Sequence, residues 1–166
     1  MRKLQEEYSP LLEGLLSSLR EFFDEALISL VVFGSVARGE AHSDSDIDLL
    51  LVVEGLPKSR LKRQSLFAQA ERKNQRLMDE LWNKNFHVDY SPILLTPDEA
   101  KKLRPLYLDM VSDAIILHDK NDFFRQVLNR LRRRLRELGA KRIRLGKLWY
   151  WDLKPDYRFG EFIEIE

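Results

Sequence analysis

Hydrophobic residues recur along the chain with two different spacings, which divide it into helices and strands. Over residues 9–26 leucines and phenylalanines return every three or four positions, the spacing of one helix face, behind a Ser-Pro pair that suits a helix start. Short continuous apolar runs at 27–33 and 47–53 predict two buried strands. The segment 61–82 is long, charged and free of Gly and Pro, and predicts one helix.

The second half of the chain continues this pattern. Alternating apolar and polar residues predict a third strand over 86–95, and the sequence TPDE at 96–99 predicts a capping box with proline in the first turn of a short helix. Residues 113–118 predict a fourth strand, at an edge of the sheet. An apolar stripe over 124–138 predicts a last helix, and the aromatic tail 148–166 is expected to be extended.

This order of elements predicts an α/β (α+β) fold, a small mixed sheet flanked by helices. A chain of 166 residues with 44% hydrophobic and 33% charged residues is expected to form one globular unit. The absence of cysteine excludes disulfides and thiolate metal sites, leaving oxygen and histidine as metal ligands. No apolar stretch is long enough for a membrane span and the first residues resemble no signal peptide, so we expect a cytoplasmic protein.

Charge is unevenly distributed, although the net charge is only +1. Residues 120–147 contain 11 Lys or Arg against two acids, a balance of +9, so the rest of the chain carries about −8. The basic helix within this segment has two interpretations. Its arginines are either solvated and paired with the acidic body, or they bind an acidic protein or an RNA acceptor.

Two aspartates, Asp46 and Asp48, open the second predicted strand. Residues two apart in a strand point to the same face, roughly 6–7 Å apart along the backbone. Like charges so placed repel each other unless a cation neutralises them, and Mg²⁺ prefers carboxylate ligands. Asp89 interrupts the third predicted strand in the same way and would add a third carboxylate, the set that a two-metal phosphoryl-transfer site requires.

The turn after the first predicted strand has the features of a phosphate site. Gly34 would let the backbone approach a phosphate, Ser35 adds a hydroxyl donor, and the N–H groups that follow can form an anion-binding nest. Arg38 is either a partner for a polyphosphate or for a nearby acid such as Glu40.

Together, Gly34-Ser35-x-Ala37-Arg38-Gly39 and Ser45-Asp46-x-Asp48-Leu49 resemble the signature of the minimal nucleotidyltransferases of the DNA polymerase beta-like superfamily. The resemblance implies transfer of a nucleoside monophosphate from a nucleoside triphosphate, which we expect to be ATP, to a hydroxyl acceptor with release of pyrophosphate. It implies two Mg²⁺ ions held by Asp46, Asp48 and Asp89, with Asp89 also assisting deprotonation of the acceptor. Gly34, Ser35 and Arg38 would hold the triphosphate.

The resemblance also suggests a division of the chain. Residues 1–119 would form the nucleotidyltransferase catalytic domain, and 120–166 a basic helix and aromatic tail packed on the same domain. The acceptor, whether protein, RNA or small molecule, the preferred base and the oligomeric state are left open.

Two other functions compete with catalysis. Family members also act as the antitoxin of a toxin–antitoxin pair, so the chain would bind, and in some cases nucleotidylate, a helical ribonuclease-like toxin. A glycosyltransferase with a manganese-binding Asp-x-Asp pair is less favoured, because it would leave Gly34 and Ser35 unexplained. The three carboxylates favour an active enzyme, because a binding module has no physical need for them.

Overall fold

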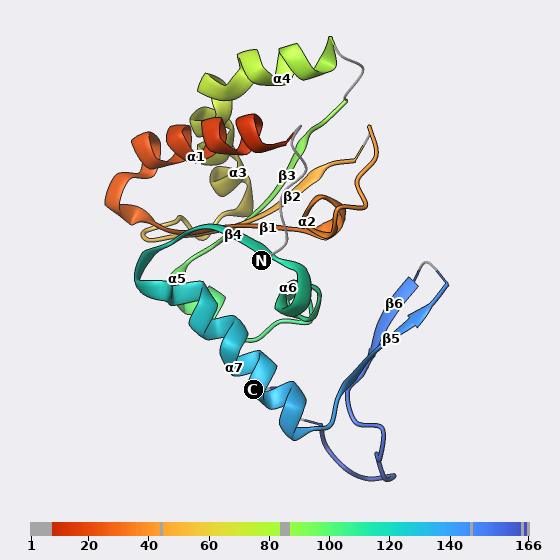
Figure 1. The fold of residues 1–166 in the computed structure, drawn as a ribbon. Coiled ribbons are helices and arrows are strands. Elements are labelled where there is room, and N and C mark those ends of the chain that lie inside the picture. The colour runs from red at the N-terminus through yellow and green to blue at the C-terminus, as the bar shows by residue number, and fades with distance from the viewer. Residues whose placement is uncertain (1–7, 44, 84–86, 147, 164, 166) are drawn as a thin grey trace.

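A four-stranded mixed sheet forms the centre of the protein (Figure 1). The structure is a computed structural model that describes residues 8–43, 45–83, 87–146, 148–163 and 165. The strands follow the order β3-β2-β1-β4, with bounds β1 Leu27–Phe33, β2 Ile47–Val53, β3 Tyr90–Leu95 and β4 Ile115–Asp119. β1 is antiparallel to β2 and β4, whereas β2 and β3 are parallel. The predicted fold class is confirmed.

One face of the sheet is covered by α1 (Ser9–Phe23) and α3 (Arg60–Glu71), which lie above it in Figure 1. The apolar stripe of α1 packs on every second residue of the two central strands, as the alternation of side chains along a strand requires. This core comprises, among others, Leu11, Leu15, Leu19, Leu30, Val32, Leu49, Leu51 and Phe67.

The opposite face is covered by α5 (Pro97–Lys101), α6 (Tyr107–Asp113) and α7 (Phe123–Glu137). The remaining residues of the central strands point to this side. This second core contains, among others, Val31, Leu50, Val52, Tyr107, Met110, Phe124, Leu128 and Leu131. The continuous apolar runs of β1 and β2 are therefore explained by helices on both faces.

The predicted helix 61–82 is broken into α3, a 3-10 turn (Arg72–Asn74) and α4 (Gln75–Trp82). Asn74 is buried, and its side-chain amide donates hydrogen bonds to the Leu11 carbonyl at 2.9 Å and to the Tyr90 hydroxyl at 2.6 Å. These tertiary bonds fix the break, which nothing in the local sequence indicates.

Several predicted boundaries were wrong. The first α-helix ends at Phe23 and continues as a 3-10 turn over Asp24–Ala26, and the third strand begins at Tyr90 rather than at 86. Residue 86 lies outside the described residues, and 87–89 are not strand. The glycine-serine turn is a short helix, α2 (Gly34–Arg38), and α6 follows α5 where no helix was predicted. Another 3-10 turn, Lys120–Asp122, leads into α7.

The beginning of the tail is a paired hairpin rather than an unpaired extended segment. β5 (Lys141–Leu145) and β6 (Leu148–Asp152) are antiparallel and form a separate two-stranded sheet, which stands beside α6 in Figure 1. Among the described residues, no helix has the length and apolar character to cross a membrane. Residence in the cytoplasm and the division of the chain at residue 119 stay predictions.

Candidate active site

The parallel pairing of β2 and β3 brings the predicted carboxylates to one edge of the sheet. Ile47 lies opposite Tyr90 and its N–H donates to the Asp89 carbonyl at 2.8 Å, which places Asp46 beside Asp89 and Asp48 opposite Ser91. Ile47, like Val88 and Tyr90 on either side of Asp89, belongs to the core under α1 and α3. Since alternate residues of a strand point to opposite faces, Asp46 and Asp48, on either side of Ile47, belong to the other face.

Asp48 is half-buried and Asp46 is exposed. Burial and the neighbouring Asp46 carboxylate raise the pKa of Asp48, while Arg38 and a hydrogen bond from Ser91 oppose this shift. Among the described residues, no lysine, arginine or histidine forms a salt bridge with either aspartate. The protein therefore concentrates negative charge here that its own cations only partly offset.

Gly34 makes a close approach to Asp48. It lies next to Phe33, the strand partner of Asp48, with a positive φ of 72°. A Cβ atom at this position would lie 2.0 Å from Asp48 Oδ2. The lack of a side chain at Gly34 therefore leaves room for the Asp48 carboxylate, while the predicted contact of this turn with a phosphate stays a prediction.

Ser35 and Arg38 belong to α2, directly beside Asp48. The helix ends at Gly39, whose N–H, together with that of Glu40, donates to the Ser35 carbonyl. No described residue hydrogen-bonds the Ser35 hydroxyl. Arg38 Nε donates to Glu40 Oε2 at 2.8 Å, so the alternative of a nearby acidic partner is realised, while the guanidinium still lowers the pKa of Asp48.

Asp89 lies at the same edge, where it lines a cavity together with Glu71 of α3 and residues of α4. Its Oδ1 accepts a hydrogen bond from the Tyr90 N–H at 2.7 Å. Burial and the negative charge of Asp89 raise the pKa of Glu71, a half-buried carboxylate that sequence reasoning missed because it lies within a uniformly charged helix. In the described part of the chain, no three His, Cys, Asp or Glu side chains are grouped closely enough to hold a metal ion.

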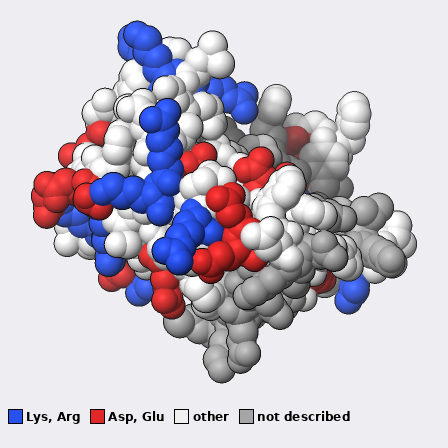
Figure 2. Space-filling view, turned by 90° about the horizontal axis from the view of Figure 1, so that it is seen from above, with Lys and Arg blue, Asp and Glu red and all other residues white. Residues whose placement is uncertain are grey.

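A cavity of about 380 Å³ opens beside Asp89, between α4 and the start of β3. Its lining combines carboxylates with apolar and aromatic side chains, including Glu71, Met78, Asp79, Trp82 and His87. Figure 2 looks onto the face that carries α1 and α4, where acidic side chains gather near the middle with basic ones beside them. The cavity is wide enough for a side chain or a small molecule.

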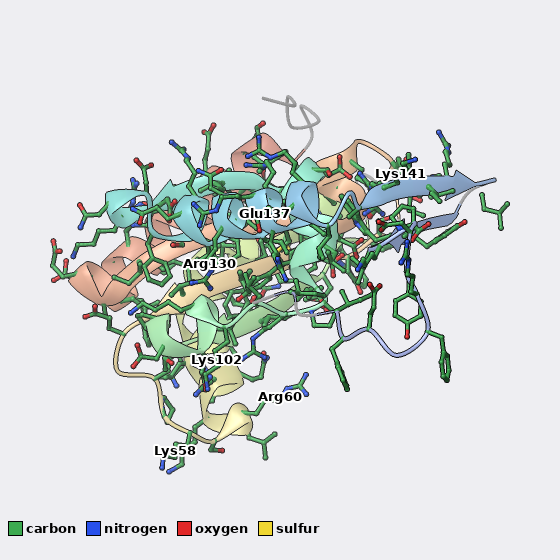
Figure 3. All side chains as sticks on the ribbon, turned by 90° about the horizontal axis from the view of Figure 1, so that it is seen from below. Lys58, Arg60, Lys102, Arg130, Glu137 and Lys141 are labelled. Carbon is green, nitrogen blue, oxygen red and sulfur yellow. The ribbon has the colours of Figure 1, made fainter. Side chains whose placement is uncertain are left out.

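The arginines of α7 mostly contact the protein itself. Arg125 pairs with Asp122 at 3.0 Å, Arg132 donates to the Val111 carbonyl at 2.6 Å, and Arg134 lies 3.4 Å from Glu137. Arg130, labelled in Figure 3, donates to the Lys101 carbonyl. These contacts favour the interpretation of a basic helix paired with the body over a nucleic-acid surface.

A model of the nucleotidyltransferase domain family matches residues 12–118, which span the sheet, the glycine-serine helix and all three aspartates. The chain belongs to this family. The predicted resemblance is thereby confirmed at the level of the family. The match ends before α7 and the hairpin, so these two elements are additions to the matched domain in this nucleotidyltransferase.

Individual known proteins are similar to this nucleotidyltransferase over most of its length. The nucleotidyltransferase is 29% identical to MJ1305 of Methanocaldococcus jannaschii, provisionally named a protein adenylyltransferase, over 74% of this chain and 79% of the relative. A solved toxin–antitoxin with AMP-PNP is 18% identical, covers 81% of this chain and 94% of its own, and gives a TM-score of 0.48. A mutant of the toxin–antitoxin pair MntA-HpeT is 17% identical over 76% of this chain and 91% of its own, also with a TM-score of 0.48.

Proposed function

We propose that this nucleotidyltransferase transfers a nucleoside monophosphate from a nucleoside triphosphate to a hydroxyl acceptor. The acceptor oxygen forms a bond to the α-phosphorus, the bond from that phosphorus to the pyrophosphate oxygen breaks, and the hydroxyl proton passes to a base. The observation that carries the proposal is the Asp46–Asp48 pair, held against Gly34 with Asp89 at the same edge.

The Asp46–Asp48 pair has the chemistry to bind divalent metal, although the described side chains do not already form a cluster of three ligands, so Asp89 would join the pair only when metal is bound. Asp46 and Asp48 offer hard oxygen ligands and lie at an edge where the protein supplies no salt-bridge partner from the described residues, which supports a bound cation as the missing counter-charge. We assign two Mg²⁺ ions to Asp46, Asp48 and Asp89. When bound, they would supply the positive charge that a phosphoryl-transfer centre needs.

The triphosphate would lie along α2. Ser35 has a hydroxyl that no described residue engages, and Arg38 provides a guanidinium able to make paired hydrogen bonds to phosphate oxygens. We propose ATP as the donor because the relative MJ1305 is named for adenylyl transfer.

The acceptor would enter through the cavity beside Asp89. We assign the Asp89 carboxylate, which lines this cavity, to take the hydroxyl proton. We propose a protein hydroxyl as the acceptor, again because the name of MJ1305 specifies protein adenylyl transfer.

The test measures binding and chemistry separately. Calorimetry with each of the four nucleoside triphosphates and Mg²⁺ should show tight binding for ATP, and none without the metal. Incubation with labelled ATP and candidate acceptors, followed by mass spectrometry, should show an added adenylyl group. Metal-independent binding of ATP would overturn the metal assignment. Stable complex formation with a helical partner, with no transfer to it or to any other acceptor, would favour the antitoxin-type binding function instead.

A further inference from the structure

A second cavity, of about 340 Å³, lies toward the other end of β3 from the three aspartates. Its lining comes from the start of α3, from residues 92–95 of β3, from Glu99 of α5 and from Arg104, and we call it the α3–α5 cavity. Among the described residues, none lines both this cavity and the one beside Asp89. The two cavities are therefore separate sites on the same edge strand.

The edge of β3 in the α3–α5 cavity is closed to a further strand. Pro92 has no N–H, and its carbonyl accepts a hydrogen bond from Gln64 Nε2 at 3.0 Å. The Leu94 carbonyl accepts one from Arg63 Nη1, also at 3.0 Å. Because these backbone groups are blocked or occupied, recognition of a ligand in this cavity depends on side chains.

The two carboxylates of α5 beside the cavity are already paired. Glu99, the one acid in the described lining, accepts two hydrogen bonds from Arg63, at 2.6 Å and 3.0 Å. Asp98 forms a salt bridge of 3.4 Å with Lys101. Each of these acids therefore has a cation of its own.

Three further cations in the lining have no acidic partner. Lys58 and Arg60 belong to the start of α3, where Figure 3 shows them, and Arg104 follows α5. Their side chains are exposed, and no carboxylate of the described chain forms a salt bridge with any of them. Arg104 Nη2 donates to the Glu99 carbonyl at 3.5 Å, a neutral partner that leaves its charge uncompensated. Since these cations come from distant parts of the chain, the fold rather than a basic run brings them to one cavity.

We propose that the α3–α5 cavity binds a small anion that carries a polyphosphate group. Arginine binds phosphate oxygens through paired hydrogen bonds, and lysine binds them as a point charge. A volume of about 340 Å³ is at the lower end of the range of small-molecule sites, roughly 300–1,000 Å³, and is larger than one phosphate needs. This site is distinct from the triphosphate site proposed at α2, and the inference does not depend on the proposed function.

Calorimetry with inorganic pyrophosphate tests the site, in metal-free buffer at fixed ionic strength. The wild type should bind, and Arg60→Gln and Arg104→Gln should each weaken binding by about three- to tenfold, because each removes a charge-assisted hydrogen bond. The control is Lys62→Gln, which removes the same charge from the first turn of α3 outside the cavity lining and should change affinity less than twofold. Absence of binding to the wild type, or equal losses in Arg60→Gln and Lys62→Gln, would overturn the proposal.

Amide NMR shifts locate the anion and distinguish its sources. Pyrophosphate should shift the resonances of residues 58–64 and Arg104 and leave those of α2 unchanged; shifts confined to α2 would overturn the second site. Metal-free ATP is then added to the Asp46→Asn, Asp48→Asn double variant. The same shifts would show that the cavity accepts a polyphosphate carried by a nucleotide, whereas shifts with pyrophosphate alone would restrict the site to the free anion.

Discussion

Two carboxylates that lie near opposite ends of β3 have pKa values shifted in opposite directions. Beyond the last residue of β3, Glu99 in α5 accepts hydrogen bonds from Arg63 Nη1 at 2.6 Å and Nη2 at 3.0 Å, and these bonds lower the pKa of Glu99 to about 2. Near the first residue of β3, burial and a like-charged neighbour raise the pKa of Asp48. Glu99 has a bidentate arginine partner, whereas Asp48 has a neighbouring carboxylate whose effect Arg38 and Ser91 only partly offset.

The difference separates a structural carboxylate from a candidate functional one. Arg63 also donates to the carbonyls of Pro57 and Leu94, so its pair with Glu99 joins the start of α3 to the sheet and to α5. The protein neutralises Glu99 with a buried arginine, and a similar cation beside Asp48 would be possible in the same fold. The Asp46–Asp48 pair, whose charge the protein only partly offsets, is therefore explained better by a bound cation than by a contribution to stability.

The largest effect should come from removing the uncompensated charge. Asp46→Asn with Asp48→Asn should reduce nucleotidyl transfer by at least about 10⁴-fold, because the metal ions that would neutralise the phosphate charge lose their ligands. In metal-free buffer at pH 7 the variant should be as stable as the wild type or more stable, since a carboxylate whose folded pKa is raised weakens the fold where it is ionised. Transfer assays and urea unfolding measure the two quantities. Wild-type transfer would place the active site elsewhere.

An Asp89→Asn variant tests whether the third carboxylate takes part in nucleotidyl transfer. Asp89→Asn should lower the single-turnover rate by about 10²–10⁴-fold, as loss of acid–base assistance does, with a much smaller change in ATP affinity. Asp98→Asn, on a fully exposed side chain, is the control. A rate equal to that of the control would remove Asp89 from the site.

Two glycines with the same φ of 72° separate backbone strain from placement of Asp48. Gly39→Ala meets no atom within 4 Å and should cost only the strain of a left-handed residue, about 1–2 kcal/mol. Gly34→Ala has the same strain and also displaces the Asp48 side chain, so transfer should fall by roughly 10²-fold. Thermal unfolding and transfer assays on both variants check this. Equal transfer rates would show that Asp48 does not depend on Gly34.

The smallest effect is expected at the compensated end, and it concerns stability alone. Glu99→Gln should lower the free energy of unfolding by about 1–2 kcal/mol at pH 7, a modest value because the Glu99 side chain is 37% exposed. The folded pKa of about 2 lies below the ordinary 4.5, so this stabilisation is present above pH 4.5 and is lost as the pH falls toward 2.

Urea unfolding between pH 7 and pH 3 should therefore show the wild-type and Glu99→Gln proteins converging in stability at low pH. ATP transfer by folded Glu99→Gln should match the wild type. A pH-independent difference in stability would mean that packing, rather than charge, accounts for the pair.

Much of the fold was predictable because it depends on local patterns. The leucine stripe of α1, the apolar runs of β1 and β2 and the capping box before α5 each carry their own signal. The break at Asn74 was not predictable, because a residue 63 positions away accepts one of the hydrogen bonds that fix it. The hairpin was missed for a related reason, since contacts of Arg142 and Trp151 with α6 stabilise it rather than a strongly apolar pattern.

By itself, the sequence determined the family, the class of fold and the carboxylates that are candidates for chemistry, because residue type and short-range spacing specify these properties. The tertiary structure decided how the carboxylates are used. The parallel register of β2 and β3 brings Asp46 beside Asp89, Gly34 leaves room for Asp48, and Arg63 rather than a metal neutralises Glu99. Charge compensation depends on distances between segments far apart in the chain, so only the folded protein defines it.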